Sequence, residues 1–213
     1  MAAIRVCFVG DSVTLGTGDI TGQGWPGRLS AYESAKGGHD ISCYNLGIRA
    51  ETSQQIHARW MQECEPRLPD HINGGLIFMF GLNDMAIDNT GNIRVSHEKS
   101  INNARAIMTL AKSWKPVLWL GPTPVRDDNP IINPGKSITF TFDDTRTKAL
   151  SDAYAKIADE LDIPYFDLHK TFAGTSEWRQ TLDAGDGVHP TGEGYKLIAN
   201  SLTNWLPWRH WLI

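Results

Sequence analysis

A serine just past the end of a short apolar segment is well placed to act as a nucleophile. Residues 4–9 (IRVCFV) are rich in β-branched and aromatic side chains and run into Gly10-Asp11-Ser12. Such a run is typical of a buried strand, and open α/β sheets bind their ligands at the carboxyl ends of strands. Serine is a weak nucleophile unless a neighbouring base takes its proton. Ser12 therefore needs a base from elsewhere in the chain.

Residues 186–189 (DGVH) offer that base together with a carboxylate. Histidine suits the task because its unperturbed pKa lies near neutrality, and a carboxylate on the second ring nitrogen would fix the tautomer. One tight turn can present both Asp186 and His189. Asp183 lies just before this segment and is an alternative partner for the ring. The sequence thus predicts Ser12, His189 and Asp186 as a catalytic triad, with the choice of carboxylate open.

Acyl transfer also needs hydrogen-bond donors for the oxygen that becomes negative in the tetrahedral intermediate. The backbone amides of Ser12 and Gly47 and the side-chain amide of Asn83 are candidates. Gly47 ends a strand predicted at residues 41–46, and glycine lets a substrate approach the backbone closely. Asn83 follows a strand predicted at residues 76–80. Because parallel strands end at one edge of a sheet, these groups can converge on a single site.

Strand-like segments alternate with helical patterns along the chain, and this order positions the candidate residues. The predicted strands are residues 4–9, 41–46, 76–80, 117–120 and 163–166, and the predicted helices cover about 25–36, 52–65, 96–114, 143–161 and 191–205. This alternation predicts an α/β fold with a parallel sheet and helices on both faces. A length of 213 residues suffices for a sizeable core and predicts one domain, residues 1–213.

The chain resembles the SGNH, or GDSL-type, hydrolase family. The resemblance rests on the segments Gly10-Asp11-Ser12, Gly47, Gly81-x-Asn83-Asp84 and Asp186-x-x-His189-Pro190, which follow the family's order over nearly the whole chain. Val13 departs from the leucine or isoleucine that often follows this serine. The resemblance implies a three-layer α/β/α sandwich with a five-stranded parallel sheet in flavodoxin-like order.

The same resemblance implies a serine esterase or lipase-type acylhydrolase. It would cleave carboxylic esters or thioesters through an acyl-enzyme, with no metal and no organic cofactor. Ser12 would be the nucleophile, His189 the base and Asp186 the orienting acid. Ser12, Gly47 and Asn83 would form the oxyanion hole. The acyl chain and the leaving group stay open among lipid, thioester and acetylated sugar.

The longest segment predicted to be irregular, residues 121–140, follows the fourth strand. Loops of this length in compact domains are usually functional or mobile. We expect this one to line the substrate pocket, with Arg126 as the substrate-binding residue most able to meet an anionic group. Whether the segment closes as a lid is left open.

A second interpretation makes residues 12–18 (SVTLGTG) a phosphate cradle. Flavodoxin-like folds bind a flavin at this position, and a loop rich in hydroxyl groups and glycine can hold a phosphate. A binding module of this kind leaves Asn83 and residues 186–189 without a role. The glycine spacing of residues 16–22 does not match a dinucleotide fingerprint.

Composition narrows the partners and the surroundings. A net charge of −4 without a dense Lys/Arg cluster argues against a nucleic-acid partner. The three cysteines form no CxxC motif, which argues against a disulfide framework and a thiolate metal site.

No apolar segment is long enough to span a bilayer, and no leader-like segment precedes the first strand, so we expect a cytoplasmic protein. The aromatic residues 205–213 are expected to pack on the domain, with a homo-oligomer contact or a lipid-facing patch as alternatives.

Overall fold

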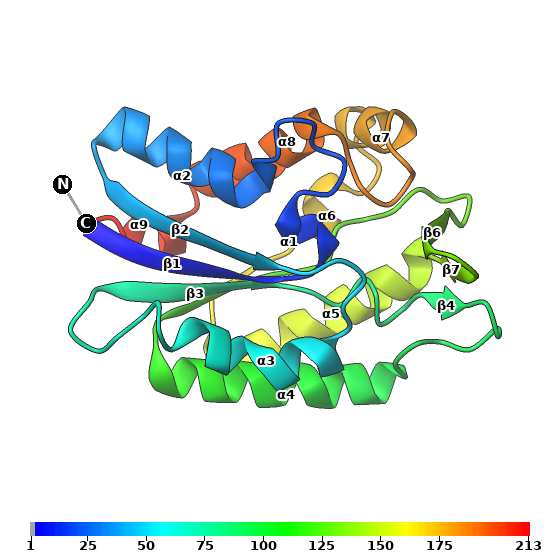
Figure 1. Cartoon of the computed structure of the whole chain (residues 1–213), viewed down its shortest axis with the longest axis horizontal. Helices are drawn as coiled ribbons and strands as arrows, with labels where there is room; N and C mark the ends of the chain where they lie inside the picture. The colour runs from blue at the N-terminus through cyan, green and yellow to red at the C-terminus, as the bar shows by residue number, and fades with distance from the viewer. Residues whose placement is uncertain (1–2) are drawn as a thin grey trace.

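A five-stranded sheet forms the centre of the molecule (Figure 1). Its strands are β1 (Ala3–Gly10), β2 (Asp40–Gly47), β3 (Gly74–Met79), β5 (Val117–Leu120) and β8 (Tyr165–Phe166), in the spatial order β2-β1-β3-β5-β8. All neighbouring strands are parallel. The computed structural model describes residues 3–213, so Met1 and Ala2, predicted to precede the first strand, lie outside it. The predicted fold class and sheet are confirmed.

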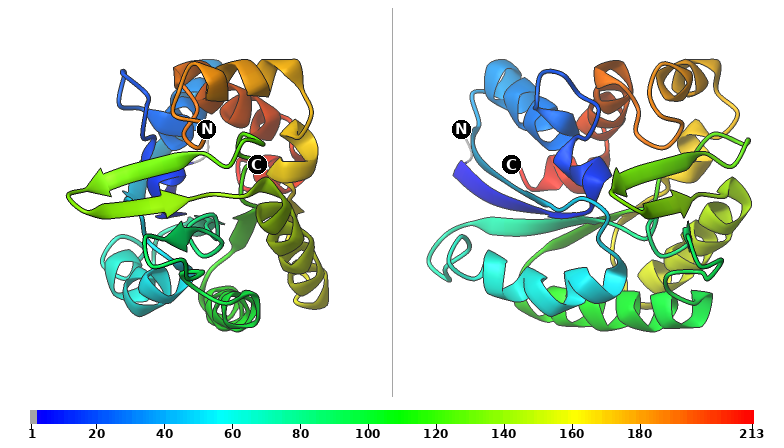
Figure 2. Two further views of the ribbon diagram at one scale, coloured as in Figure 1. Left: turned by 90° about the vertical axis from the view of Figure 1, so that its right-hand side faces the viewer. Right: turned by 45° about the vertical axis from the view of Figure 1, so that its right-hand side comes forward.

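Helices cover both faces of the sheet, which gives three layers (Figures 1 and 2). One face packs against α1 (Ser12–Leu15), α2 (Gly24–Gly37), α6 (Leu168–Phe172), α7 (Ser176–Asp183), α8 (Gly192–Thr203) and α9 (Leu206–His210). The other face packs against α3 (Ser53–Cys64), α4 (His97–Trp114) and α5 (Asp144–Glu160).

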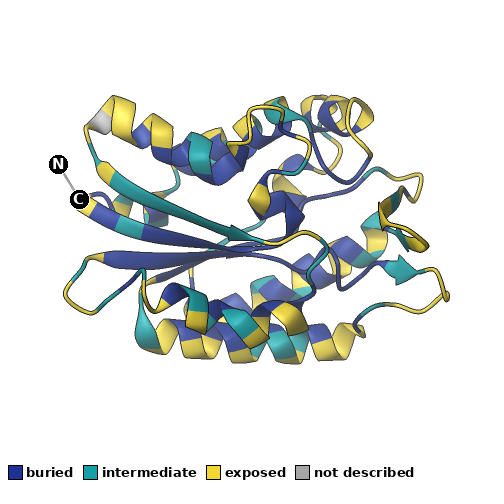
Figure 3. Cartoon of the chain, viewed as in Figure 1, coloured by how far each residue is buried: buried dark blue, intermediate teal, exposed yellow. Residues whose placement is uncertain are grey.

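The two cores follow from the alternation of side chains along buried strands. In β1, Phe8 faces the first layer and packs edge-on against Trp25, with ring centroids 5.3 Å apart. In β3, Phe78 faces the opposite layer and packs in the same way against Trp60 at 5.3 Å. Strands that are buried on both faces read as continuous apolar runs. Figure 3 shows the central strands buried between helices whose outer faces are exposed.

The segment at residues 121–140 is more regular than predicted. Strands β6 (Ile131–Gly135) and β7 (Ile138–Thr141) form an antiparallel hairpin, and β7 also pairs with the short strand β4 (Ile87–Asp88). Figure 2 shows the hairpin projecting beside the end of the sheet where α1 begins. Sequence reasoning missed these strands because all three are short and none is fully buried, and β6 contains a proline.

The aromatic C-terminal segment packs on the body of the domain. Trp208 is fully buried and its Nε1–H donates to Glu33 Oε1 at 3.1 Å. Arg209 Nη1 pairs with the second oxygen of the same buried carboxylate at 2.6 Å. This packing agrees with the expectation for residues 205–213. In the part of the chain that the structure describes, no helix has both the length and the apolar character needed to cross a membrane.

Candidate active site

Ser12 lies at the carboxyl end of β1, as the first residue of α1. Asp11 caps this helix, and its Oδ1 accepts the Val13 amide at 3.0 Å. Burial raises the pKa of Asp11 to about 6, against the opposing hydrogen bond from Val13. Within residues 3–213, no group accepts a hydrogen bond from the Ser12 amide. The turn therefore offers both the Ser12 hydroxyl and its amide at the sheet edge.

Three side chains form one line of hydrogen bonds across the site. Ser12 Oγ lies 2.7 Å from His189 Nε2, and His189 Nδ1 lies 2.7 Å from Asp186 Oδ2. When Nδ1–H is donated to the carboxylate, Nε2 carries the lone pair that accepts the Ser12 hydroxyl proton. His189 is 7% exposed, so little water competes for these bonds. The structure thus brings together the predicted hydroxyl, base and carboxylate.

The turn that carries Asp186 also fixes the orientation of its carboxylate. Oδ1 accepts the backbone amides of Val188 at 3.0 Å and His189 at 2.7 Å. Gly187 has a φ of +86°, a backbone conformation that favours glycine. Partial burial would raise the pKa of Asp186, but the hydrogen bonds and charge of His189 outweigh it and hold that pKa below its ordinary value. Asp186 is therefore ionised over the pH range in which a histidine base works.

Asp183 and Arg126, both expected near the site, do not line the cavity beside Ser12. The Asp183 carboxylate pairs with Arg126 at 3.9 Å and with Arg179 at 3.6 Å, and it does not contact the histidine ring. Arg126 donates to Asp128 Oδ1 at 2.7 Å and lines a separate cavity. Arg126 is thus absent from the wall of the cavity beside Ser12, and the substrate-binding role expected for it stays a prediction from the sequence. Its backbone amide instead donates to Gly187 O at 2.8 Å and supports the loop that carries the base.

Asn83 lies close to Ser12 and is held at both ends of its amide. Its Nδ2 donates to Asp11 Oδ2 at 3.1 Å, and its Oδ1 accepts from Arg94 Nη1 at 3.2 Å. Asn83 is 3% exposed and lines the same cavity as Ser12 and His189. One of its two N–H groups stays available for a substrate oxygen.

Gly47 does not occupy the position expected of an oxyanion donor. Its backbone amide donates to Asn45 Oδ1 at 3.0 Å, and the side-chain Nδ2 of Asn45 donates to Thr14 O at 2.9 Å. A Cβ at Gly47 would lie 2.3 Å from Leu15 N, so glycine is needed there for the close packing of β2 against α1. The oxyanion role expected for Gly47 is corrected to a packing role, because its donor is occupied by a neighbouring side chain.

Ala50 lies where Gly47 was expected. It lines the cavity with Ser12 and Asn83, and no group among residues 3–213 accepts a hydrogen bond from its amide. Its φ of +62° is uncommon for a residue other than glycine, and its carbonyl oxygen accepts from Arg94 Nη2 at 2.7 Å. Sequence reasoning missed Ala50 because alanine does not signal a turn with positive φ, and it missed Arg94 because no local pattern shows which acceptors a long side chain reaches.

A cavity of about 510 Å³ opens beside the catalytic side chains. Its polar wall consists of Ser12, Arg49, Asn83, Asp186, His189 and Asn133, and its apolar wall consists of Ala50, Ile131, Ile132, Pro134, Phe140 and Phe142. Most of the apolar wall belongs to the β6–β7 hairpin and the residue that follows it. The expectation that residues 121–140 line the pocket therefore agrees with the structure at residues 131–134 and 140. Arg49, whose Nε donates to Thr17 Oγ1 at 3.0 Å, is the cation on the wall.

The glycines after β1 pack against the chain, and the Gly16 and Thr17 amides both donate to Ser12 O, at 3.1 Å and 3.0 Å. A Cβ at Gly16 would lie 2.6 Å from the Cα of Gly24, and a Cβ at Gly18 would lie 3.0 Å from the carbonyl oxygen of Pro190. These glycines allow the loop to pack closely against α2 and against Pro190, the residue that follows His189. The flavin-binding interpretation is therefore not favoured.

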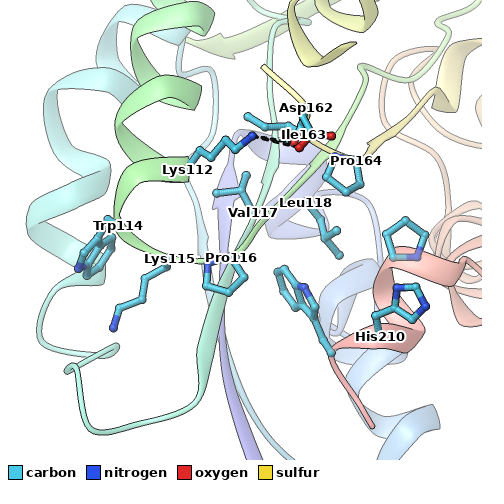
Figure 4. Close-up of a pocket in the computed structure, with 12 residues that line it drawn as sticks. Lys112, Trp114, Lys115, Pro116, Val117, Leu118, Asp162, Ile163, Pro164 and His210 are labelled. Carbon is cyan, nitrogen blue, oxygen red and sulfur yellow. Dashed lines mark hydrogen bonds and ion pairs between the residues drawn. The ribbon is translucent and has the colours of Figure 1, made fainter. Parts of the chain in front are cut away.

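A second cavity, of about 590 Å³, carries none of this chemistry (Figure 4). It lies at the opposite end of the sheet, where β5 begins, and Lys112 and Lys115 are its cations. Figure 4 shows Lys112 joined to Asp162, a bond of 3.4 Å, and Lys115 pairs with Asp70 at 3.2 Å. Its cations are paired and no serine lines it, so the cavity beside Ser12 is the candidate active site.

Comparison with known sequences finds a matching family and two similar proteins. The profile described as the GDSL-like lipase/acylhydrolase family matches residues 8–197. An isoamyl acetate-hydrolyzing esterase from Saccharomyces cerevisiae is 30% identical over 154 residues, which cover 68% of this chain. The chain spans 62% of the length of that relative. A GDSL esterase/lipase, CPRD49, from Arabidopsis thaliana is 31% identical over 70 residues, which are 30% of this chain and 27% of that one.

Solved structures share the fold at lower identity. A lipase/acylhydrolase from Enterococcus faecalis superposes with a TM-score of 0.71 at 20% identity, over 98% of this chain and 97% of its own. Axe2, an acetylxylan esterase from Geobacillus stearothermophilus, superposes with a TM-score of 0.71 at 19% identity, over 93% of this chain and 91% of its own. These likenesses confirm the three-layer architecture.

Proposed function

Because the chain belongs to the GDSL-like lipase/acylhydrolase family, we propose that it hydrolyses carboxylic esters through an acyl-enzyme on Ser12. One observation carries the proposal: the unbroken line of hydrogen bonds from Asp186 through His189 to Ser12 Oγ, with both distances 2.7 Å. A hydroxyl, a neutral imidazole and an ionised carboxylate in that order are the requirements for an activated serine.

In the first half-reaction, Ser12 Oγ attacks the ester carbonyl carbon while His189 Nε2 takes the hydroxyl proton. The carbonyl oxygen becomes an oxyanion in the tetrahedral intermediate. Collapse of the intermediate breaks the bond to the leaving alkoxide, which takes the proton from His189. The acyl group then remains on Ser12. Asp186 stabilises the imidazolium through the bond to Nδ1–H and stays ionised throughout.

In the second half-reaction, water attacks the acyl-enzyme and gives a proton to His189. The second tetrahedral intermediate releases the carboxylic acid, and His189 returns the proton to Ser12 Oγ. In both intermediates we assign oxyanion stabilisation to three donors: the amides of Ser12 and Ala50 and the free N–H of Asn83. Such donors act on charge that is absent in the ground state, and they therefore raise the rate of the chemical step.

We propose acetyl esters as the substrate class to test first. The S. cerevisiae relative is named for isoamyl acetate and Axe2 for acetylxylan, and both names contain an acetyl ester. The apolar wall formed by Ile131, Ile132 and Phe140 supports an alkyl group on one side of the scissile bond.

A cytoplasmic location and a homo-oligomer stay predictions from the sequence. Light scattering on the purified protein tests the oligomeric state.

The direct test is covalent labelling combined with hydrolysis of p-nitrophenyl acetate. A fluorophosphonate should modify Ser12 and abolish the release of p-nitrophenol, and Ser12→Ala should be neither labelled nor active. The site can be located by mass spectrometry of the labelled peptide. Labelling at a different serine, or full activity in Ser12→Ala, contradicts the proposal.

A further inference from the structure

Arg94 contacts both side-chain and backbone elements of the site from behind the cavity wall. Its Nη1 donates to Asn83 Oδ1 at 3.2 Å, and its Nη2 donates to the carbonyl oxygen of Ala50 at 2.7 Å. The residues lining the cavity include Asn83 and Ala50 but not Arg94. One rigid guanidinium therefore holds the two residues to which we assign oxyanion donors beyond Ser12.

The bond to Asn83 selects one orientation of its amide. In that orientation Oδ1 faces the guanidinium and Nδ2 faces the Asp11 carboxylate, at 3.1 Å. A flipped amide would set donors against the donors of Arg94 and an oxygen against the Asp11 oxygen. Both contacts would be repulsive. Arg94 and Asp11 together thus keep the second N–H of Asn83 pointed away from both of them.

The bond to Ala50 restrains a residue whose backbone is strained. A non-glycine residue at a φ of +62° persists where the surroundings hold it. The guanidinium fixes the Ala50 carbonyl, and the buried Asp84 holds the following turn through the Ser53 amide at 2.7 Å. These two contacts fix the direction in which Ala50 presents its own amide.

The β6–β7 hairpin covers the guanidinium. The ring of Phe140, on β7, lies over Arg94 with its centroid 4.1 Å from Cζ. Phe140 also lines the substrate cavity. The face of an aromatic ring attracts a guanidinium that lies over it and shields it from water on that side. The hairpin that forms the apolar wall therefore also stabilises the group behind the oxyanion donors.

We infer that Arg94 is a positioning residue of the oxyanion hole, acting through Asn83 and Ala50, and this inference rests on the proposed function. Loss of the guanidinium should leave substrate binding nearly intact and slow the chemical step. A lysine has one ammonium and lacks the fork that reaches two acceptors at once. Arg94→Lys should therefore recover only part of the rate.

The test uses Arg94→Ala and Arg94→Lys with p-nitrophenyl acetate. In Arg94→Ala we expect kcat to fall about 10- to 100-fold with KM changed by less than about threefold. Added guanidinium ion at millimolar concentration should restore several-fold of the activity. A trifluoromethyl ketone, which forms an oxyanion on Ser12, should bind more weakly by about the same factor as kcat falls.

Arg146→Ala is the matched control, because Arg146 also donates to a backbone carbonyl, that of Met85 at 3.0 Å, away from the cavity. It should lower the melting temperature without changing kcat or the inhibitor affinity by more than about twofold. If Arg94→Ala does not fold, Arg94→Lys with the inhibitor decides the question. Normal kcat and inhibitor affinity in a folded Arg94 variant would overturn the inference. Failure of the proposed function is distinguishable, because then the wild type itself neither hydrolyses the ester nor labels at Ser12.

Discussion

The Asp186 carboxylate holds His189 twice, with Oδ2 2.7 Å from the ring Nδ1 and Oδ1 2.7 Å from the backbone amide of the same residue. The two bonds use different oxygens of one carboxylate, so the ring and the main chain are oriented by the same group. The side chain of Asp186 is nevertheless 44% exposed. Water can therefore reach this partner of the base, although the base itself is buried.

Asp186→Asn should reduce kcat by about 10²- to 10⁴-fold. An amide cannot stabilise the imidazolium as a carboxylate does, and its NH₂ group would favour the wrong tautomer of His189. Solvent access should keep the loss smaller than that of His189→Ala. Asp183→Asn is the control, since its carboxylate pairs with Arg126 and Arg179. Steady-state kinetics check this, and a larger loss in the Asp183 variant would show that the wrong carboxylate has been assigned.

Asn83→Ala should lower kcat by about 10²- to 10³-fold with little change in KM. It removes a donor that acts on the oxyanion, while the nucleophile and base remain, so slow labelling of Ser12 by a phosphonate should persist. Asn83→Asp should be at least as inactive, because a carboxylate would repel the developing charge. Melting temperature and kcat are measured on the same sample. A near-normal kcat with a lowered melting temperature would assign Asn83 a purely structural role.

Asp11→Asn should alter how stability depends on pH. The folded state raises the pKa of Asp11 from 3.8 to about 6, so between these values the folded protein binds more protons than the unfolded chain. Stability from this group is thus fully present below the unfolded pKa and is lost as the pH rises through about 6. The total effect is about 3 kcal/mol, of which roughly 2 kcal/mol lies between pH 4.5 and 7.5.

Urea unfolding of both proteins at those two pH values measures the effect. The asparagine is neutral throughout, so any clash with the Asn83 amide costs the same at each pH. The advantage of wild type over Asp11→Asn in the free energy of unfolding should therefore shrink as the pH rises. A difference that is constant with pH, or that grows, would contradict a raised pKa at Asp11.

The double substitution Ile131→Ala and Ile132→Ala should shift preference among acetate esters. Both side chains line the cavity, so truncation removes apolar contact with the alkyl group of the substrate. Each methylene-sized contact that is lost costs about 1–3 kcal/mol of transition-state binding. We expect kcat/KM to fall more for pentyl acetate than for methyl acetate. Ile138→Ala, on the same hairpin but outside the cavity wall, is the control. An identical ester profile in all three proteins would remove the hairpin from the substrate site.

Local pattern was enough to predict much of this protein. Continuous apolar runs gave the five parallel strands, and their order placed Ser12, Asn83 and His189 at one sheet edge, because parallel strands end on the same side. The short separation of Asp186 and His189 predicted that a single turn would present them together. These inferences depend on the periodicity of apolar residues and on residues that lie close together in the chain, and both are visible in the sequence itself.

Other features depended on contacts between distant segments. Gly47 and Ala50 lie three residues apart, and only the contact of Asn45 with the first amide decides which donor stays free. The charge of Arg126 is paired by Asp128, and the role of Arg94 follows from its contacts with Asn83, Ala50 and Phe140. No local pattern encodes which acceptor a long side chain reaches. That choice is made by packing, which buries each polar group where a partner is available.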